Sequence, residues 1–96
     1  MNKFYLFSKE SCGPCALVEK YMNAIKDERT SLLEKVDLED FSETPIPQEN
    51  LDLAAKYGVT ATPVLVVTDA DGVKLAEYIG GMGITQNIRK VFDKYA

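Results

Sequence analysis

The chain has 96 residues, 46% of them hydrophobic and 27% charged, and its formal net charge is −4. This size and composition predict a single globular domain over residues 1–96 and disfavour a disordered chain. The negative charge argues against binding to nucleic acid or to an anionic membrane surface, because both need clustered lysines and arginines.

The first part of the chain predicts a strand followed by a helix. Residues 3–7 form an apolar, aromatic run that fits a strand buried on both faces. This run is too short for a signal-peptide core, no stretch approaches a membrane span, and the chain begins with Met1, so we expect a soluble, cytoplasmic protein. Residues 28–31 are typical of a turn. Between them, from Gly13 to about Asp27, apolar residues recur at helical spacing: Leu17, Val18, Tyr21, Met22 and Ile25.

The middle of the chain predicts a second strand, a loop and a short helix. A strand over residues 32–38 is expected mainly because a β-α-β unit needs its second strand. Residues 40–48 contain Thr-Pro-Ile-Pro and are typical of a loop. A short helix with apolar residues from Leu51 to Tyr57 is expected to stop at Gly58, a residue type common just after helix ends.

The last third predicts a hairpin and a final helix. Residues 64–68 are the strongest strand by β-branched content, residues 69–72 form a turn, and residues 73–79 form the returning strand. Gly80-Gly81-Met82-Gly83 then interrupts the pattern. We expect Thr85 to cap a last helix with one apolar face, formed by Ile88, Val91, Phe92 and Tyr95. This order of elements predicts one compact α/β domain.

Two cysteines and the absence of histidine limit the possible chemistry. One chain supplies too few of these residues for a structural zinc site, and we expect no bound metal and no other cofactor. Cys12-Gly13-Pro14-Cys15 lies at the junction between the first predicted strand and the helix that follows it. In a cytosolic protein, a pair with this spacing is more often redox-active than structural. Without this context, cysteines that only fill space, or half of a shared metal site, would compete with that interpretation.

The helix start suits the chemistry of disulfide exchange. The reaction needs a thiolate, and an ordinary thiol, with a pKa of about 8.5, is mostly protonated at neutral pH. Unpaired amides and the positive end of the helix dipole, including the amide of Cys15, can stabilise a Cys12 thiolate. Cys15 can then attack the mixed disulfide and release the reduced substrate. Gly13 permits the close approach of another chain, and Pro14 stiffens the turn.

The motif resembles the active site of thioredoxins, whose signature is Cys-Gly-Pro-Cys. The similarity continues through residues 56–63, Lys-Tyr-Gly-Val-Thr-Ala-Thr-Pro, and then through the apolar strand to Gly80-Gly81. It implies one thioredoxin-like domain with the order β-α-β-α-β-β-α, in which a four-stranded mixed sheet is flanked by helices. It also implies disulfide exchange with Cys12 as the nucleophile and Cys15 as the resolving cysteine.

The resemblance further implies a substrate groove beside the dithiol. Pro63 is expected to follow a cis peptide bond there, and Thr62 is expected to offer its backbone to an extended substrate segment. Gly80 and Gly81 resemble the segment that closes the other side of the groove. Ser11 replaces the tryptophan that usually precedes the motif, and we expect this residue to contact substrate as well.

Other departures from the family pattern concern size and the buried acid. The first strand begins at about Lys3, so the extra N-terminal strand and helix of ordinary thioredoxins are missing, and the size is that of a glutaredoxin. Leu6 stands where thioredoxins carry an acid that helps to deprotonate the second cysteine. Lys35 matches the lysine through which that acid is thought to act. Glu10 and Lys9 are the candidates for assisting the second cysteine instead.

The segment between Leu38 and Asn50 looks longer than in typical thioredoxins, and its surroundings are acidic. Such a charge run is most often a solvated face, and a docking surface for a basic partner is the sharper interpretation. Lys35 is the lone basic residue among these acids, which are Glu34, Asp37, Glu39, Asp40, Glu43, Glu49 and Asp52.

We therefore expect a monomeric protein-disulfide reductase whose dithiol is restored by a thioredoxin-reductase-type flavoenzyme. The resemblance implies clients such as ribonucleotide reductase. The alternative is a glutaredoxin that uses glutathione, favoured by the length and by Gly80-Gly81. Glutaredoxins normally carry Pro-Tyr between the cysteines, however, and only Thr85 suits the glutathione carboxylate. A non-catalytic scaffold or subunit, and a dimer that shares zinc or an iron–sulfur cluster, remain open.

Overall fold

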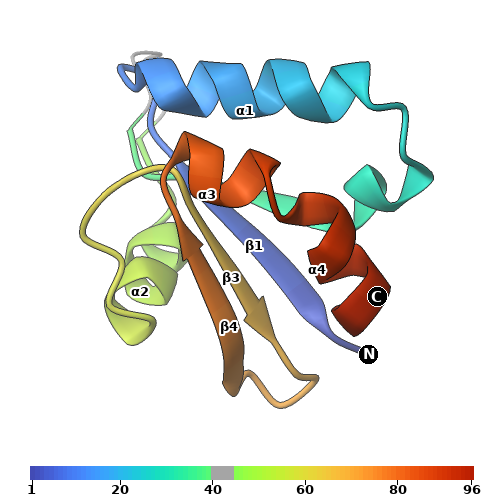
Figure 1. Ribbon diagram of the computed structural model, residues 1–96. Coiled ribbons are helices and arrows are strands. Elements are labelled where there is room, and N and C mark those ends of the chain that lie inside the picture. Colours follow the sequence, from blue (N-terminus) through green and yellow to red (C-terminus); the bar gives the residue numbers. More distant parts are fainter. Residues whose placement is uncertain (40–44) are drawn as a thin grey trace.

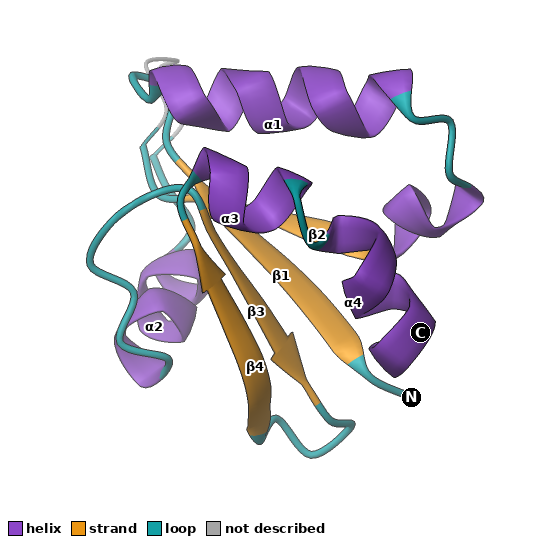
Figure 2. Ribbon diagram, in the orientation of Figure 1, coloured by secondary structure: helices purple, strands orange, loops and turns teal. Residues whose placement is uncertain are grey.

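A mixed β-sheet with helices on both faces organises the chain (Figure 1). The structure, a computed structural model, describes residues 1–39 and 45–96. The described residues form the strands β1 (Lys3–Ser8), β2 (Leu33–Asp37), β3 (Val64–Thr68) and β4 (Lys74–Ile79), in the order β2-β1-β3-β4 across the sheet. β1 is parallel to β2 and antiparallel to β3, and β4 is antiparallel to β3 (Figure 2). This arrangement confirms the predicted α/β fold, and the predicted strand ends differ by about one residue.

The helices form two layers. α1 (Gly13–Ala24), α3 (Gly81–Thr85) and α4 (Ile88–Tyr95) cover one face of the sheet, and α2 (Gln48–Lys56) covers the other (Figure 1). A short 3₁₀ helix, η1 (Glu28–Leu32), occupies the predicted turn between α1 and β2. None of the helices in the described ranges is long and apolar enough to cross a membrane.

The alternation of side chains along the two central strands builds a separate core on each face. The core under α1, α3 and α4 consists of Phe4, Leu6, Val18, Met22, Leu65, Val67, Ile84, Ile88, Val91 and Phe92. The core under α2 consists of Tyr5, Phe7, Val36, Ala54, Tyr57, Val64 and Val66. Because β1 and β3 are buried on both faces, their sequences are continuous apolar runs rather than alternating ones, as predicted for residues 3–7.

α1 is shorter than predicted and buries fewer of its apolar residues. It ends at Ala24 rather than near Asp27, because Lys26 has a φ of 52° and takes the chain out of the helix. Val18 and Met22 are buried as expected. Leu17, which the helical pattern places with them, is 65% exposed. It lies one position, and therefore about 100°, away from the buried stripe.

The loop and helix after β2 differ from the prediction at the start of the helix. Part of the predicted loop, residues 40–44, lies outside the described residues, and residues 45–47 belong to no helix or strand. α2 begins at Gln48 rather than near Leu51. The side-chain amide of Asn50, in its first turn, donates to the Asp37 carbonyl oxygen at 3.0 Å and so ties the helix to the end of β2. The helix ends at Lys56, and Gly58 follows with a φ of 67°, as its predicted role as a stop residue requires.

The segment after β4 differs more from the prediction than any other described part of the chain. Residues 80–83 were expected to interrupt the pattern, but Gly81 begins α3, and Thr85 is its last residue rather than the cap of the final helix. α4 instead follows Asn87, whose side-chain amide donates to the Gly83 carbonyl oxygen at 2.7 Å. Glycine is a weak helix former, so tertiary packing decides here: Ile84 is fully buried in the core beneath α1.

Candidate functional site

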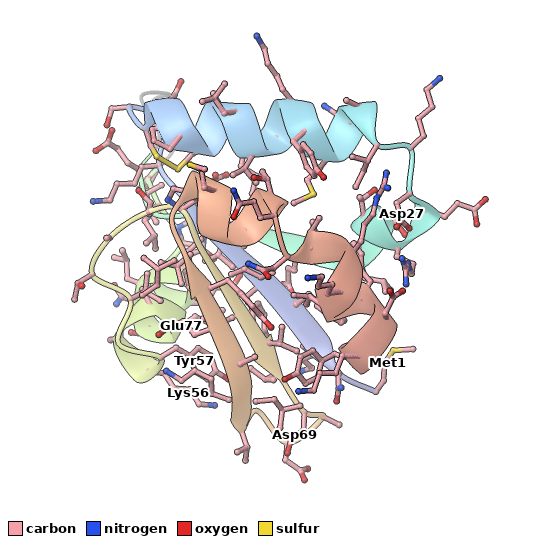
Figure 3. The ribbon with its side chains drawn as sticks, in the orientation of Figure 1. Met1, Asp27, Lys56, Tyr57, Asp69 and Glu77 are labelled. Carbon is pink, nitrogen blue, oxygen red and sulfur yellow. A yellow bond between two sulfur atoms is a disulfide. The ribbon has the colours of Figure 1, made fainter. Side chains whose placement is uncertain are left out.

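Cys12 and Cys15 form a disulfide at the start of α1, with their Cα atoms 5.2 Å apart (Figure 3, yellow bond). Cys12 is the N-cap residue in an extended conformation, and its Sγ accepts a hydrogen bond from the Cys15 amide at 3.2 Å. Gly13 and Pro14 occupy the first helical positions, where an amide has no helical acceptor to lose. This is the position that the sequence predicted for the pair.

The two sulfurs differ in accessibility. Cys15 is buried, with 4% of its surface exposed. Cys12 is half-buried and is flanked by the exposed residues Ser11, Gly13 and Pro14. An incoming disulfide can therefore reach Cys12 more readily than Cys15.

The segment after β4 contacts the motif and is joined to the segment before β3. The Thr62–Pro63 peptide bond is cis, as expected, and the carbonyl oxygen of Pro63 accepts a hydrogen bond from the Gly80 amide at 2.9 Å. Gly81 lies against the motif, so that a Cβ on Gly81 would lie 3.5 Å from the Cβ of Pro14. The fold thus joins Pro63 to Gly80 and sets Gly81 against the motif, while the substrate-binding roles of Thr62, Gly80 and Gly81 stay predictions.

Ser11 lies in a short loop that is tied to the chain after β2. Its amide donates to a carboxylate oxygen of Glu39 at 3.3 Å, and the neighbouring Glu10 amide donates to the Glu39 carbonyl oxygen at 3.2 Å. These contacts fix the backbone just before Cys12. The side chain of Ser11 is exposed next to the disulfide, and contact with substrate stays a prediction for it.

A cavity of about 300 Å³ opens beside the disulfide, between α1 and the ends of β1 and β2. It is mostly polar, and its wall includes both cysteines. The remaining lining residues are Ser8, Lys9, Glu10, Ala16, Glu19, Lys35, Asp37 and Glu39.

The strand register explains why charges gather in this cavity. Lys35 pairs with Leu6, and Asp37 pairs with Ser8, so these four residues lie on one face of the β1–β2 pair, the face that Leu6 shares with α1. The Lys35 ammonium contacts the carboxylate of Glu19 on α1 and lies 3.6 Å from that of Asp37.

The contact with Glu19 keeps Lys35 charged, and Asp37, the second carboxylate near Lys35, has a further hydrogen-bond partner. The hydrogen bond to Glu19 is the main reason why the pKa of Lys35 is raised, so this side chain stays protonated. The Ser8 hydroxyl donates to Asp37 at 3.2 Å.

Sequence reasoning named part of this cluster and missed the rest. Lys35, Lys9 and Glu10 were named, and all of them line the cavity. Glu19 and Ser8 were missed. Glu19 lies four positions after Cys15, a spacing that places two side chains on the same helix face, and this signal could have identified it.

An apolar hollow adjoins the motif on the opposite side from this cavity. It is lined by Pro14, Leu17, Gly81, Met82 and Thr85. Leu17 and Met82 are 65% and 71% exposed, so large apolar side chains meet solvent beside the dithiol. Within the described residues, no group of three or more Cys, Asp or Glu side chains converges as a metal site would require.

Two of three comparisons with known proteins found matches. A family model described as a thioredoxin-like domain matches residues 2–96. Curated protein sequences gave no significant match. Among solved structures, thioredoxin from Fasciola hepatica is 25% identical, with a TM-score of 0.71 over 99% of this chain and 81% of that one.

Two further structures share the fold at lower identity. Reduced thioredoxin pre-protein from Schistosoma mansoni is 18% identical, with a TM-score of 0.72 over 99% of this chain and 79% of that one. Oxidised mitochondrial thioredoxin 3 from Saccharomyces cerevisiae is 22% identical, with a TM-score of 0.64 over 97% of this chain and 77% of that one.

Proposed function

The chain belongs to the thioredoxin-like domain family, and from that premise we propose that it is a protein-disulfide reductase of the thioredoxin type. The observation that carries the proposal is the position of Cys12. Its sulfur caps a helix, accepts the amide hydrogen of Cys15 and forms a disulfide with that residue. In the reduced protein, the helix start and the Cys15 amide can stabilise a thiolate at Cys12, and Cys15 keeps a second sulfur within reach of it.

The reaction has two exchange steps. In the first, the Cys12 thiolate attacks one sulfur of a substrate disulfide, and the other substrate sulfur leaves as a thiolate. In the second, Cys15 loses its proton and attacks Cys12, so that the remaining substrate sulfur is released. The substrate has then gained two electrons, and the protein holds the Cys12–Cys15 disulfide. The exposed side chains of Leu17 and Met82 offer apolar contacts to the peptide on either side of the substrate sulfur.

Recycling by a flavoenzyme of the thioredoxin-reductase type is proposed ahead of recycling by glutathione. Glutathione carries a net negative charge. Among the described residues, the cavity beside the dithiol presents four carboxylates, from Glu10, Glu19, Asp37 and Glu39, against the ammonium groups of Lys9 and Lys35. Thr85, the residue considered for the glutathione carboxylate, ends α3 rather than beginning a helix. The helix end presents carbonyl oxygens, which do not attract an anion.

Reduction of insulin disulfides tests the proposal when it is measured in parallel with two reducing systems. One system contains NADPH and a thioredoxin reductase, and the other contains NADPH, glutathione and glutathione reductase. We expect turnover with the first system and little with the second. Cys12→Ser is expected to abolish turnover, because no nucleophile remains.

Two results would replace this function with an alternative. Turnover with glutathione alone, or reduction of a glutathione mixed disulfide by Cys15→Ser, would assign the chain to the glutaredoxins, whose monothiol reaction needs only Cys12. Full biological activity of the Cys12→Ser, Cys15→Ser double variant would favour a scaffold role. We further propose that the active protein is a cytoplasmic monomer with disulfide-containing clients such as ribonucleotide reductase.

A further inference from the structure

The second exchange step needs a proton acceptor that the two cysteines do not provide. Burial in a protein disfavours the charged form of a thiol, and Cys15 is buried. Only its thiolate can attack the mixed disulfide. A base within reach of Cys15 would therefore speed the second step without affecting the first.

We propose that Glu19 takes the proton of Cys15 in the second step and that Lys35 holds the Glu19 carboxylate in position. The inference rests on the function proposed above and adds two residues to it. Glu19 lies one helical turn after Cys15 on the same face of α1, and both side chains line the polar cavity beside the disulfide. The contact with Lys35 of β2 ties the carboxylate to the cavity wall. The proton passes directly or through a water molecule, for which the cavity has room.

Glu19 is better placed for this role than the other carboxylates in the cavity. Glu39 accepts the Ser11 amide, and Asp37 accepts the Ser8 hydroxyl, so both are engaged in holding the backbone and the strands. Glu10 belongs to the loop before Cys12, whereas Glu19 shares a helix face with Cys15. Besides Lys35 and these carboxylates, the charged group that lines the cavity within residues 1–39 and 45–96 is Lys9, from the loop after β1.

The proton and electron balance is complete without another reactant. The Cys15 S–H bond breaks, and its proton neutralises the Glu19 carboxylate. The Lys35 ammonium, no longer facing a full negative charge on Glu19, then stabilises the new thiolate. That thiolate forms the bond to Cys12 while the bond from Cys12 to the substrate sulfur breaks. The proton on Glu19 finally passes to the solvent or to the departing substrate thiolate.

A chromogenic aromatic disulfide, dithiobis-nitrobenzoate, separates the two steps. The reduced protein releases one coloured thiolate when Cys12 attacks and a second one when Cys15 resolves the mixed disulfide, and stopped-flow absorbance follows both releases. For Glu19→Gln we expect an unchanged first release and a second release slowed by about 10- to 100-fold near neutral pH. The difference should shrink as the pH rises beyond about 8.5, the value for an ordinary thiol, because solvent then takes a growing share of the Cys15 proton, although burial moves this change to higher pH than for a free cysteine.

Control variants keep the result interpretable. Glu34→Gln removes one charge from the neighbouring residue of β2, which lies on the other face of that strand, and should leave both releases unchanged. Lys35→Met keeps Glu19 but removes the ammonium group that holds its carboxylate, so it should slow the second release by a smaller factor than Glu19→Gln does. If Glu19→Gln does not fold, the proposal is tested by the rate of the second release in Glu19→Asp and in Lys35→Met.

The two releases separate the role of Glu19 from the proposed function. A second release that is unchanged in Glu19→Gln, or slowed equally at every pH, overturns this inference and leaves the proposed function standing. Absence of the first release from the unmodified protein would instead overturn the proposed function itself.

Discussion

At the scale of single residues, the site depends on the different surroundings of two identical side chains. Cys12 caps α1 and is half-buried, whereas Cys15 is buried one turn further into the helix. The helix start lowers the cost of a negative charge on the first sulfur, and burial raises it for the second. This difference supports the proposed roles of Cys12 in attack and Cys15 in resolution.

The reduced protein should therefore be alkylated at Cys12 under conditions in which free cysteine reacts slowly. We expect the rate of iodoacetamide modification of the Cys15→Ser variant to stay high well below pH about 8.5, the range in which an ordinary thiol becomes protonated. The measurement is the modification rate as a function of pH, followed by mass spectrometry. The Cys12→Ser variant, which retains only the buried thiol, serves as the control and should react slowly. A pH profile for Cys15→Ser that matches free cysteine would contradict the proposed role of the helix start.

The sequence predicts the residues of the dithiol but not all of their neighbours. Cys12 and Cys15 can be identified from their spacing at a strand-to-helix junction, which is a local signal. The contact between Glu19 and Lys35 depends instead on the β1–β2 register and on how α1 lies across those strands. Nothing local to either residue encodes that placement, so the pair could be found only in the folded chain.

At the scale of elements, the chain after β4 shows how tertiary contacts override local propensity. Three of the residues 80–83 are glycines, a composition that argues against a helix. α3 forms there because Ile84 is buried in the core and Gly81 lies against Pro14. β1 and β3, in contrast, were predictable because their apolar runs contribute to both cores, whereas β2 was expected mainly because a β-α-β unit needs its second strand.

Gly80 and Gly81 should respond in opposite ways to the same substitution. Gly80 has a φ of 84° and a ψ of 159°, a conformation that is essentially restricted to glycine, so Gly80→Ala should destabilise the protein by about 1–3 kcal/mol. Gly81 is helical and has ordinary van der Waals room for a Cβ beside Pro14, so Gly81→Ala should leave stability unchanged or raise it by up to about 1 kcal/mol. Urea denaturation of both variants measures the difference, and equal losses would show that the strain is not confined to Gly80.

At the scale of the whole molecule, Arg29 connects the link after α1 to the last helix. Its guanidinium bonds the carboxylate of Asp27 at the start of η1 and that of Asp93 on α4, 64 positions away. It also lies 5.3 Å from the ring centre of Phe92, which is fully buried in the core. A single side chain thus ties the return from α1 to the C-terminal end of the fold, at the edge of the molecule away from the dithiol (Figure 3).

The charge on Asp27 makes this connection sensitive to acid. Hydrogen bonds from the Arg29 side chain and amide lower the pKa of Asp27 to about 2 from its usual 3.8. A lowered carboxyl pKa stabilises the fold above the unfolded-state value, and this contribution is lost as the pH falls through the folded-state value. We therefore expect Asp27→Asn to lower the Tm at neutral pH and the gap to the unmodified protein to narrow between pH 4 and pH 2. Thermal melts followed by circular dichroism across this range measure the gap, with Asp71→Asn, in the exposed β3–β4 turn, as the control for loss of one negative charge. If the melting curves of Asp27→Asn and the unmodified protein shift in parallel down to the lowest pH, the ionised carboxylate contributes nothing to the link between η1 and α4.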